Sequence, residues 1–272
     1  MKYDTWQYNI DVFYDTRDKS VAEFSEDTDK LLKNTFVYKD AYELISSDEM
    51  PHNNDMEIVV IEGGTVSTAY DIKKNRGGRV AMLNFADALV PGGLVLDGAS
   101  TQEENICRCT NLYESLIQKK CKEQYYDVNN QFGSGPVKYR VEKYANALIY
   151  SENVTIFKDD VTYKDIPPQY VDVITSPSPF GVFPGVDKVL KYRIEGIIKA
   201  AYVHGVEHIV LGAWGCGAFM QNPKTVSRCF KEVLAEFPVF NSVTFAIRPT
   251  VGNKNKTLKI FYNTFRPGTP LF

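Results

Sequence analysis

Hydrophobic and polar positions along this chain recur with two different periods, which predicts strands and helices in turn. Short runs rich in Val and Ile, such as residues 57–61 (EIVVI) before Gly63-Gly64, indicate buried strands. Longer segments carry apolar residues three or four positions apart, as helices with one buried face do. The predicted strands are 57–61, 79–85, 147–150, 154–157, 171–175, 208–211 and 242–247, and the predicted helices are 20–33, 65–74, 101–119, 187–203 and 223–237. This alternation predicts an α/β fold with helices on both faces of a sheet.

The domain organisation follows from the absence of any break in this pattern. The chain shows no repeat, no low-complexity tract and no long linker, so we expect one main domain rather than two. Residues 1–50 are more polar and predicted to be helical. We interpret them as an N-terminal helical extension packed on a main domain of residues 51–272.

Composition and charge narrow the function classes. The hydrophobic residues make up 44% and the charged residues 24% of the 272 positions, which excludes disordered and fibrous proteins. A net charge of −3 argues against general nucleic-acid binding, which needs a broad basic surface. Five cysteines, an odd number, and no long apolar run predict a cytoplasmic protein with reduced thiols and no membrane partner.

Two glycine-rich loops follow predicted strands, where open α/β sheets bind ligands. The first is 87–94 (DALVPGGL), and the second is 212–219 (GAWGCGAF). Glycines let the backbone approach a ligand closely, so that successive N–H groups can face one anion. Asn222-Pro223 predicts a helix start behind the second loop. Neither loop matches a P-loop or a dinucleotide fingerprint. A cradle for phosphate or diphosphate is the functional interpretation, and a pair of tight turns is the structural one.

Adjacent glutamates, Glu103 and Glu104, begin the predicted helix 101–119. With Ser100 and Thr101 they fit two overlapping capping boxes, which is the simpler interpretation. Their place after the first glycine loop also puts a carboxylate beside any bound diphosphate. Successive helical side chains point about 100° apart. One glutamate can therefore act as acid and then base while the other holds a sugar hydroxyl.

Two other motifs carry less weight. His204-Gly-Val-Glu-His208 matches an inverted zinc-protease string, but a helix end and a strand start separate its histidines. We expect capping and surface roles for both, and no metal site. Cys216 lies between two glycines, and the sequence gives no histidine that would activate its thiol. Nucleophilic catalysis by Cys216 is therefore disfavoured.

The linked motifs closely resemble those of microbial-type poly(ADP-ribose) glycohydrolases. The signature of that family is three glycines, a spacer of six to eight residues, and Gln-Glu-Glu. Here Pro91-Gly92-Gly93-Leu94 is followed by Gln102-Glu103-Glu104. The resemblance continues through residues 105–113 (NICRCTNLY), 150–160 (YSENVTIFKDD), 171–179 (VDVITSPSP) and 211–219 (LGAWGCGAF).

This resemblance implies a three-layer α/β/α macrodomain-like sandwich with a mixed sheet, and hydrolysis of O-glycosidic ribose–ribose bonds in poly(ADP-ribose). Glu104 would be the acid and base, and Glu103 would hold the neighbouring ribose. ADP-ribose or ADP-ribosylated substrates would be the partners, without cofactor or metal. The residues expected to bind substrate are Asn84, Gly92, Gly93, Gln102, Gly215, Cys216, Gly217, Ala218 and Phe219.

One position departs from the signature, because Leu94 replaces its third glycine. A leucine there takes up space or needs a different φ than glycine, so polymer cleavage can be retained, altered or lost. Two alternatives therefore stay open. One is a mono-ADP-ribosyl hydrolase acting on modified protein or nucleic acid. The other is a non-catalytic macrodomain that binds ADP-ribose.

Overall fold

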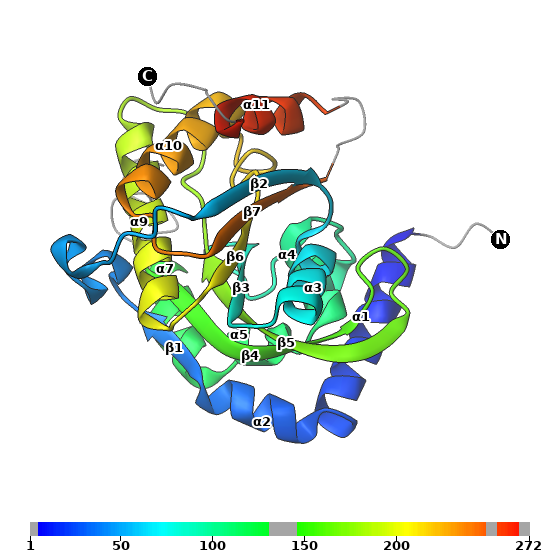
Figure 1. Cartoon of the computed structure of the whole chain (residues 1–272). Helices are drawn as coiled ribbons and strands as arrows, with labels where there is room; N and C mark the ends of the chain where they lie inside the picture. Colours follow the sequence, from blue (N-terminus) through cyan, green and yellow to red (C-terminus); the bar gives the residue numbers. More distant parts are fainter. Residues whose placement is uncertain (1–4, 131–145, 249–254, 267–272) are drawn as a thin grey trace.

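A mixed β-sheet forms the centre of the protein, in a computed structural model that describes residues 5–130, 146–248 and 255–266 (Figure 1). Its strands are β1 (Thr35–Tyr38), β2 (Glu57–Glu62), β3 (Val80–Phe85), β4 (Leu148–Lys158), β5 (Asp165–Ser176), β6 (His208–Leu211) and β7 (Ser242–Ile247). They lie in the order β1-β4-β5-β3-β6-β7-β2. The β1-β4-β5 part is antiparallel, and the run from β5 through β3, β6 and β7 to β2 is parallel. The carboxyl ends of the parallel strands therefore meet at one edge.

Helices cover both faces of this sheet. The larger ones are α1 (Thr5–Ala22), α2 (Ser25–Lys33), α3 (Thr65–Arg76), α4 (Gln102–Cys109), α5 (Leu112–Leu116), α9 (Val186–Val203), α10 (Pro223–Glu236) and α11 (Lys256–Phe265). Along β3, Ala81 and Leu83 join a core with α9, α10 and α11, while Val80 and Met82 join a core with α1, α3, α4 and α5. Alternate strand residues point to opposite faces. The protein is thus the three-layer α/β/α sandwich expected from the sequence.

The two N-terminal helices lie against the second of these cores. Phe13 of α1 and Leu31 of α2 are fully buried within it. Asp15 of α1 forms an ion pair with Lys158 at the end of β4. The hydroxyl of Thr16 donates to the backbone oxygen of Arg108 in α4 (2.6 Å). The N-terminal helices therefore contact the helix that carries the paired glutamates.

Some predicted elements differ from the structure. The continuous helix 101–119 is wrong, because α4 ends at Cys109 and Thr110 adopts an extended backbone that bridges to Ile156 of β4. The predicted strands 147–150 and 154–157 form one strand, β4, with a register shift between Ser151 and Val154. The predicted helix 20–33 is α2 preceded by a separate α1. The sequence pattern did not predict β1 or α11.

No helix in the described part of the chain is long and apolar enough to cross a membrane. All five cysteines are free, and all but Cys216 are buried.

Candidate active site

Two neighbouring strands position the candidate site. β3 and β6 pair in parallel at the middle of the sheet, so the glycine loops that follow them leave the same edge. The first loop turns after Phe85, where the Asp87 carboxylate accepts the backbone N–H groups of Leu89 (2.7 Å) and Val90 (3.0 Å). The sequence thus brings both predicted loops together.

Gly92 and Gly93 both adopt positive φ, 71° and 60°. A Cβ on Gly92 would lie 2.8 Å from the ring of Tyr113. A Cβ on Gly93 would lie 2.5 Å from Glu104 Oε1 and 3.1 Å from Glu103 Oε2. Only glycine satisfies both the conformation and the space at these positions. The first loop therefore lies directly against the paired carboxylates.

Glu103 is buried and held by two donors. Asn84 Nδ2 donates to Oε1 (3.2 Å), and the backbone N–H of Asp87 donates to Oε2 (2.7 Å). Burial raises the pKa of Glu103 well above its usual value, against the lowering effect of these two hydrogen bonds. Glu103 therefore ties α4 to the end of β3 and the start of the loop.

Glu104 is buried like Glu103, at 4% exposure, but its carboxylate has different hydrogen-bond partners. The backbone N–H of Leu94 donates to Oε1 (3.0 Å), and the Thr101 hydroxyl donates to Oε2. Thr101, the N-cap of α4, makes no side-chain cap to the helix backbone. The capping-box interpretation is therefore wrong for Thr101 and Glu104: these side chains bond each other, and the carboxylate faces the glycine loop.

Leu94 fits the loop without strain. Its φ is −100° and its ψ is 34°, which an L-residue adopts readily. Its side chain is 52% exposed and its N–H is the donor to Glu104. Leucine therefore has no positive φ at this position, and its N–H holds the Glu104 carboxylate.

Gln102 connects the helix to the sheet. Its Oε1 accepts the backbone N–H of Phe85 (2.8 Å), and its Nε2 donates to the backbone oxygen of Leu83 (2.7 Å) and to Thr65 Oγ1 (3.1 Å). These bonds fix the first turn of α4 at the carboxyl end of β3.

The second loop leaves backbone donors open. Within the described part of the chain, no acceptor receives the N–H of Gly217, Ala218 or Phe219. A Cβ on Gly217 would meet nothing within 4 Å, whereas one on Gly215 (φ 77°) would collide with Ser178 Oγ. Behind this loop, the Asn222 side chain accepts the N–H of Lys224 (2.9 Å) and caps α10, with Pro223 in the first turn. Unpaired N–H groups at a helix start form an anion-binding arrangement.

Cys216 lies in the same loop as a neutral thiol. Its partial burial removes water from the thiol and raises the pKa of Cys216 to about 12. Because the thiolate is the reactive form, Cys216 is no nucleophile near neutral pH.

A cavity of about 490 Å³ lies beside the second loop. Of the residues predicted to form the site, those that line it are Gln102, Gly215, Cys216, Gly217, Ala218 and Phe219. The other predicted site residues do not line it: Asn84, Gly92, Gly93, Glu103 and Glu104. The second loop thus forms the open wall, and the glutamates form a buried cluster next to it.

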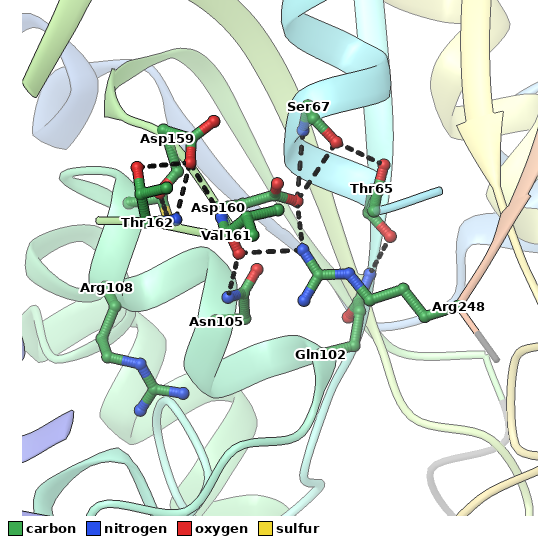
Figure 2. A network of polar contacts seen from close by, with 12 residues as sticks. Thr65, Ser67, Gln102, Asn105, Arg108, Asp159, Asp160, Val161, Thr162 and Arg248 are labelled. Atoms are coloured by element: carbon green, nitrogen blue, oxygen red, sulfur yellow. Dashed lines mark hydrogen bonds and ion pairs between the residues drawn. The ribbon is translucent and has the colours of Figure 1, made fainter. Parts of the chain in front are cut away.

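Sequence reasoning missed one part of this cavity. Arg248, at the end of β7, lines the cavity and pairs with the buried Asp160 (2.7 Å). Figure 2 shows this pair beside Asn105 of α4 and Ser67 of α3. Asn105 Nδ2 donates to the Asp160 backbone oxygen (3.1 Å). The only sequence signal for this ion pair was Gly63-Gly64, since Gly64 leaves room for it. A glycine pair is equally expected at the end of a strand, so it did not point to Arg248.

The two histidines of the zinc-like string have separate partners. His204 Nδ1 contacts Glu152 (2.7 Å), and His208 Nδ1 contacts Ser242 (2.7 Å). His208 is buried, so the predicted surface role is wrong for it. In residues 5–130, 146–248 and 255–266, no three or more His, Cys, Asp or Glu side chains gather as metal ligands do.

The fold and the candidate site together identify the class of domain. A three-layer α/β/α domain with two glycine loops and paired glutamates at the carboxyl edge of its sheet is a macrodomain-like domain. Residues 3–159 match the family described as microbial-type PARG (poly(ADP-ribose) glycohydrolase), catalytic domain, and the chain belongs to that family.

Solved structures agree with this assignment. The poly(ADP-ribose) glycohydrolase of Thermomonospora curvata is 27% identical with a TM-score of 0.82, covering 95% of this chain and 100% of that one. The same enzyme bound to the inhibitor ADP-HPD is 28% identical, with a TM-score of 0.81 and the same coverage. The Deinococcus radiodurans enzyme in complex with ADP-ribose is 30% identical with a TM-score of 0.76, covering 87% of this chain and 96% of that one. None of the curated proteins compared with the chain matches it.

Proposed function

We propose that this protein hydrolyses the O-glycosidic ribose–ribose bonds of poly(ADP-ribose) and releases ADP-ribose. Membership of the PARG catalytic-domain family and the likeness to an enzyme solved with ADP-ribose support the substrate. The observation that carries the mechanism is the hydrogen bond from the backbone N–H of Leu94, in the first glycine loop, to the Glu104 carboxylate (3.0 Å).

The diphosphate would lie on the second loop. The open N–H groups of Gly217, Ala218 and Phe219 face the charge that a diphosphate brings, and the start of α10 adds its dipole. Phe219 lines the cavity, where its ring would pack on a sugar. These backbone donors explain how a chain of net charge −3 can bind an anionic ligand.

The ribose at the reacting end would lie beside the first loop, next to Gly92 and Gly93. Asn84 supports this placement, because its Oδ1 is buried and has no partner among the described residues. A ribose hydroxyl would supply the missing donor. Glu103, already bonded to Asn84, would accept from the same sugar.

Glu104 would carry out the chemistry. As a carboxylic acid it donates its proton to the departing ribose oxygen while the bond from the anomeric carbon to that oxygen breaks. As a carboxylate it then takes a proton from the water that attacks the anomeric carbon. The products are ADP-ribose and a polymer shortened by one unit. These steps use no metal and no cofactor.

The test is to compare the wild-type protein with Glu104→Gln on poly(ADP-ribose) and on mono-ADP-ribosylated protein, measuring free ADP-ribose. We expect release from the polymer by the wild type and a loss of at least about 100-fold in the variant. Glu26→Gln is the matched control, because Glu26 lies in the first turn of α2 and is exposed.

Three outcomes would contradict the proposal. Release only from the mono-ADP-ribosylated protein would make the protein a mono-ADP-ribosyl hydrolase. Binding of ADP-ribose without release from either substrate would make it a reader. Release that survives Glu104→Gln would exclude Glu104 as the acid and base.

A further inference from the structure

Arg248 places a charged side chain at one end of the cavity, whereas the second glycine loop offers only uncharged residues. Among the described residues that line the cavity, Arg248 is the only charged one. It follows β7, and its side chain is 46% exposed. The walls around it come from the end of β2, the end of β7 and the start of α11.

The guanidinium of Arg248 is held in place by buried groups. Its Nη2 contacts Asp160 Oδ2 (2.7 Å) and donates to the Asp160 backbone oxygen (2.9 Å). The same carboxylate oxygen accepts the backbone N–H of Ser67 (3.3 Å), at the start of α3 (Figure 2). The buried carboxylate offsets the charge of Arg248 but leaves its planar shape and its exposed edge.

Gly64 makes room for this pair. Its φ is −85°, so no left-handed conformation requires glycine there. A Cβ on Gly64 would collide with Asp160 Oδ2 and lie 2.5 Å from Arg248 Nη2 and 2.9 Å from Nε. The glycine at the N-cap of α3 therefore leaves space for the guanidinium, which places Arg248 as a fixed part of the cavity wall.

We propose that Arg248 contacts the purine base of the bound nucleotide and determines specificity for it. This inference rests on the proposed function: with the diphosphate on the second loop and one ribose beside Glu104, the remaining cavity receives the nucleoside end. That part is lined by Ala246, Ile247 and Leu258, which suit a flat aromatic ring. A guanidinium stacks on such a ring or donates to its nitrogens. Because Asp160 already offsets its charge, Arg248 favours a neutral base over another phosphate.

The test compares two ligands by calorimetry: ADP-ribose and diribosyl diphosphate, which lacks the base. Arg248→Ala is expected to weaken binding of ADP-ribose about 10-fold, within the range for base stacking, and to leave diribosyl diphosphate unchanged. Arg248→Lys keeps a cation beside Asp160 but loses the planar group, so it is expected to weaken only ADP-ribose as well. Arg228→Ala is the matched control, since Arg228 is 47% exposed and pairs with Glu232 outside the cavity.

Equal weakening of both ligands would overturn the inference, because Arg248 would then act on the diphosphate or on the fold. Unchanged binding of ADP-ribose in Arg248→Ala would overturn it too. Failure of the wild-type protein to bind ADP-ribose would overturn it together with the proposed function. If ADP-ribose binds with the expected dependence on Arg248 but no substrate is cleaved, only the proposed catalytic function fails.

Discussion

Gly93 lies so close to Glu104 that a Cβ added to residue 93 would be only 2.5 Å from the Glu104 carboxylate oxygen Oε1. The glycine loop and the helix α4 therefore fit together only when residue 93 has no side chain. The same fit aligns the next N–H, from Leu94, with Glu104 Oε1.

Gly93→Ala is expected to lower turnover on poly(ADP-ribose) at least about 100-fold, because it displaces the Glu104 carboxylate from its place in the loop. The measurement is steady-state release of ADP-ribose, with thermal unfolding as a check on folding.

The control for Gly93→Ala is Gly205→Ala. Gly205 also has a positive φ, 72°, but no atom lies within 4 Å of an added Cβ. It therefore reports the backbone strain alone, about 1–2 kcal/mol of unfolding free energy. Equal loss of turnover in both variants would show that strain, not the carboxylate, is responsible.

Leu94→Gly is expected to keep wild-type turnover, because the donor to Glu104 is the backbone N–H and the leucine side chain is exposed. Its φ of −100° suits any residue, so glycine only adds freedom to the unfolded chain. We expect the variant to lose about 0.4–1 kcal/mol of unfolding free energy. Denaturant unfolding and polymer cleavage measure the two effects. A clear rise in polymer turnover would instead show that Leu94 restricts the substrate.

The sequence predicted the sheet well where local pattern decides the structure. The run at 242–247 forms β7, in which every residue is buried. The Val- and Ile-rich run at 57–61 forms β2, but the expected burial is wrong, because β2 is the edge strand of the sheet and its residues are only partly buried or exposed. The helix 101–119 failed for a physical reason. Its apolar periodicity continues through Thr110, but a bridge to Ile156, remote in sequence, extends the backbone there.

The same limit applies to the candidate site. The two glycine loops and the paired glutamates lie within short motifs, so sequence reasoning found them. Arg248 and Asp160 lie 88 residues apart and meet only after β7 takes its place between β6 and β2. Gly64 is the residue whose identity reflects this ion pair, because a side chain there would collide with Asp160 and Arg248. The sequence alone does not show which groups lie beside Gly64.

We propose that residues 1–50 form an extension on which the first glycine loop depends. Phe13 is fully buried and its ring packs edge-on against Tyr113 (4.8 Å between centroids), which in turn lies under Gly92. Phe13→Ala is expected to cost about 3–5 kcal/mol of unfolding free energy. Tyr14→Ala removes a neighbouring ring that is half exposed and is expected to change stability by about 0.5 kcal/mol. Urea unfolding of both variants checks the contrast, and equal losses would contradict this role for Phe13.

The stability of the folded protein is expected to depend on pH through Glu103. Burial raises the pKa of Glu103 in the folded protein well above its usual value of 4.5. Below pH 4.5 the carboxyl is protonated in both folded and unfolded states, so it adds no pH dependence. As the pH rises above 4.5, the unfolded state releases this proton and the folded state retains it, so the folded protein loses stability relative to the unfolded one.

Glu103→Gln removes this dependence, because an amide does not titrate and still offers an oxygen to the N–H of Asp87. We expect the wild-type protein to lose unfolding free energy relative to Glu103→Gln as the pH rises above 4.5, until the pH passes the raised pKa of Glu103 in the folded protein. Urea unfolding at several pH values measures both proteins under the same conditions. Glu26→Gln serves as the control, because Glu26 is exposed and its replacement leaves the Glu103 site intact. Parallel curves for wild type and Glu103→Gln would show that Glu103 is ionised in the folded state, held by Asn84 and Asp87 more strongly than burial opposes it.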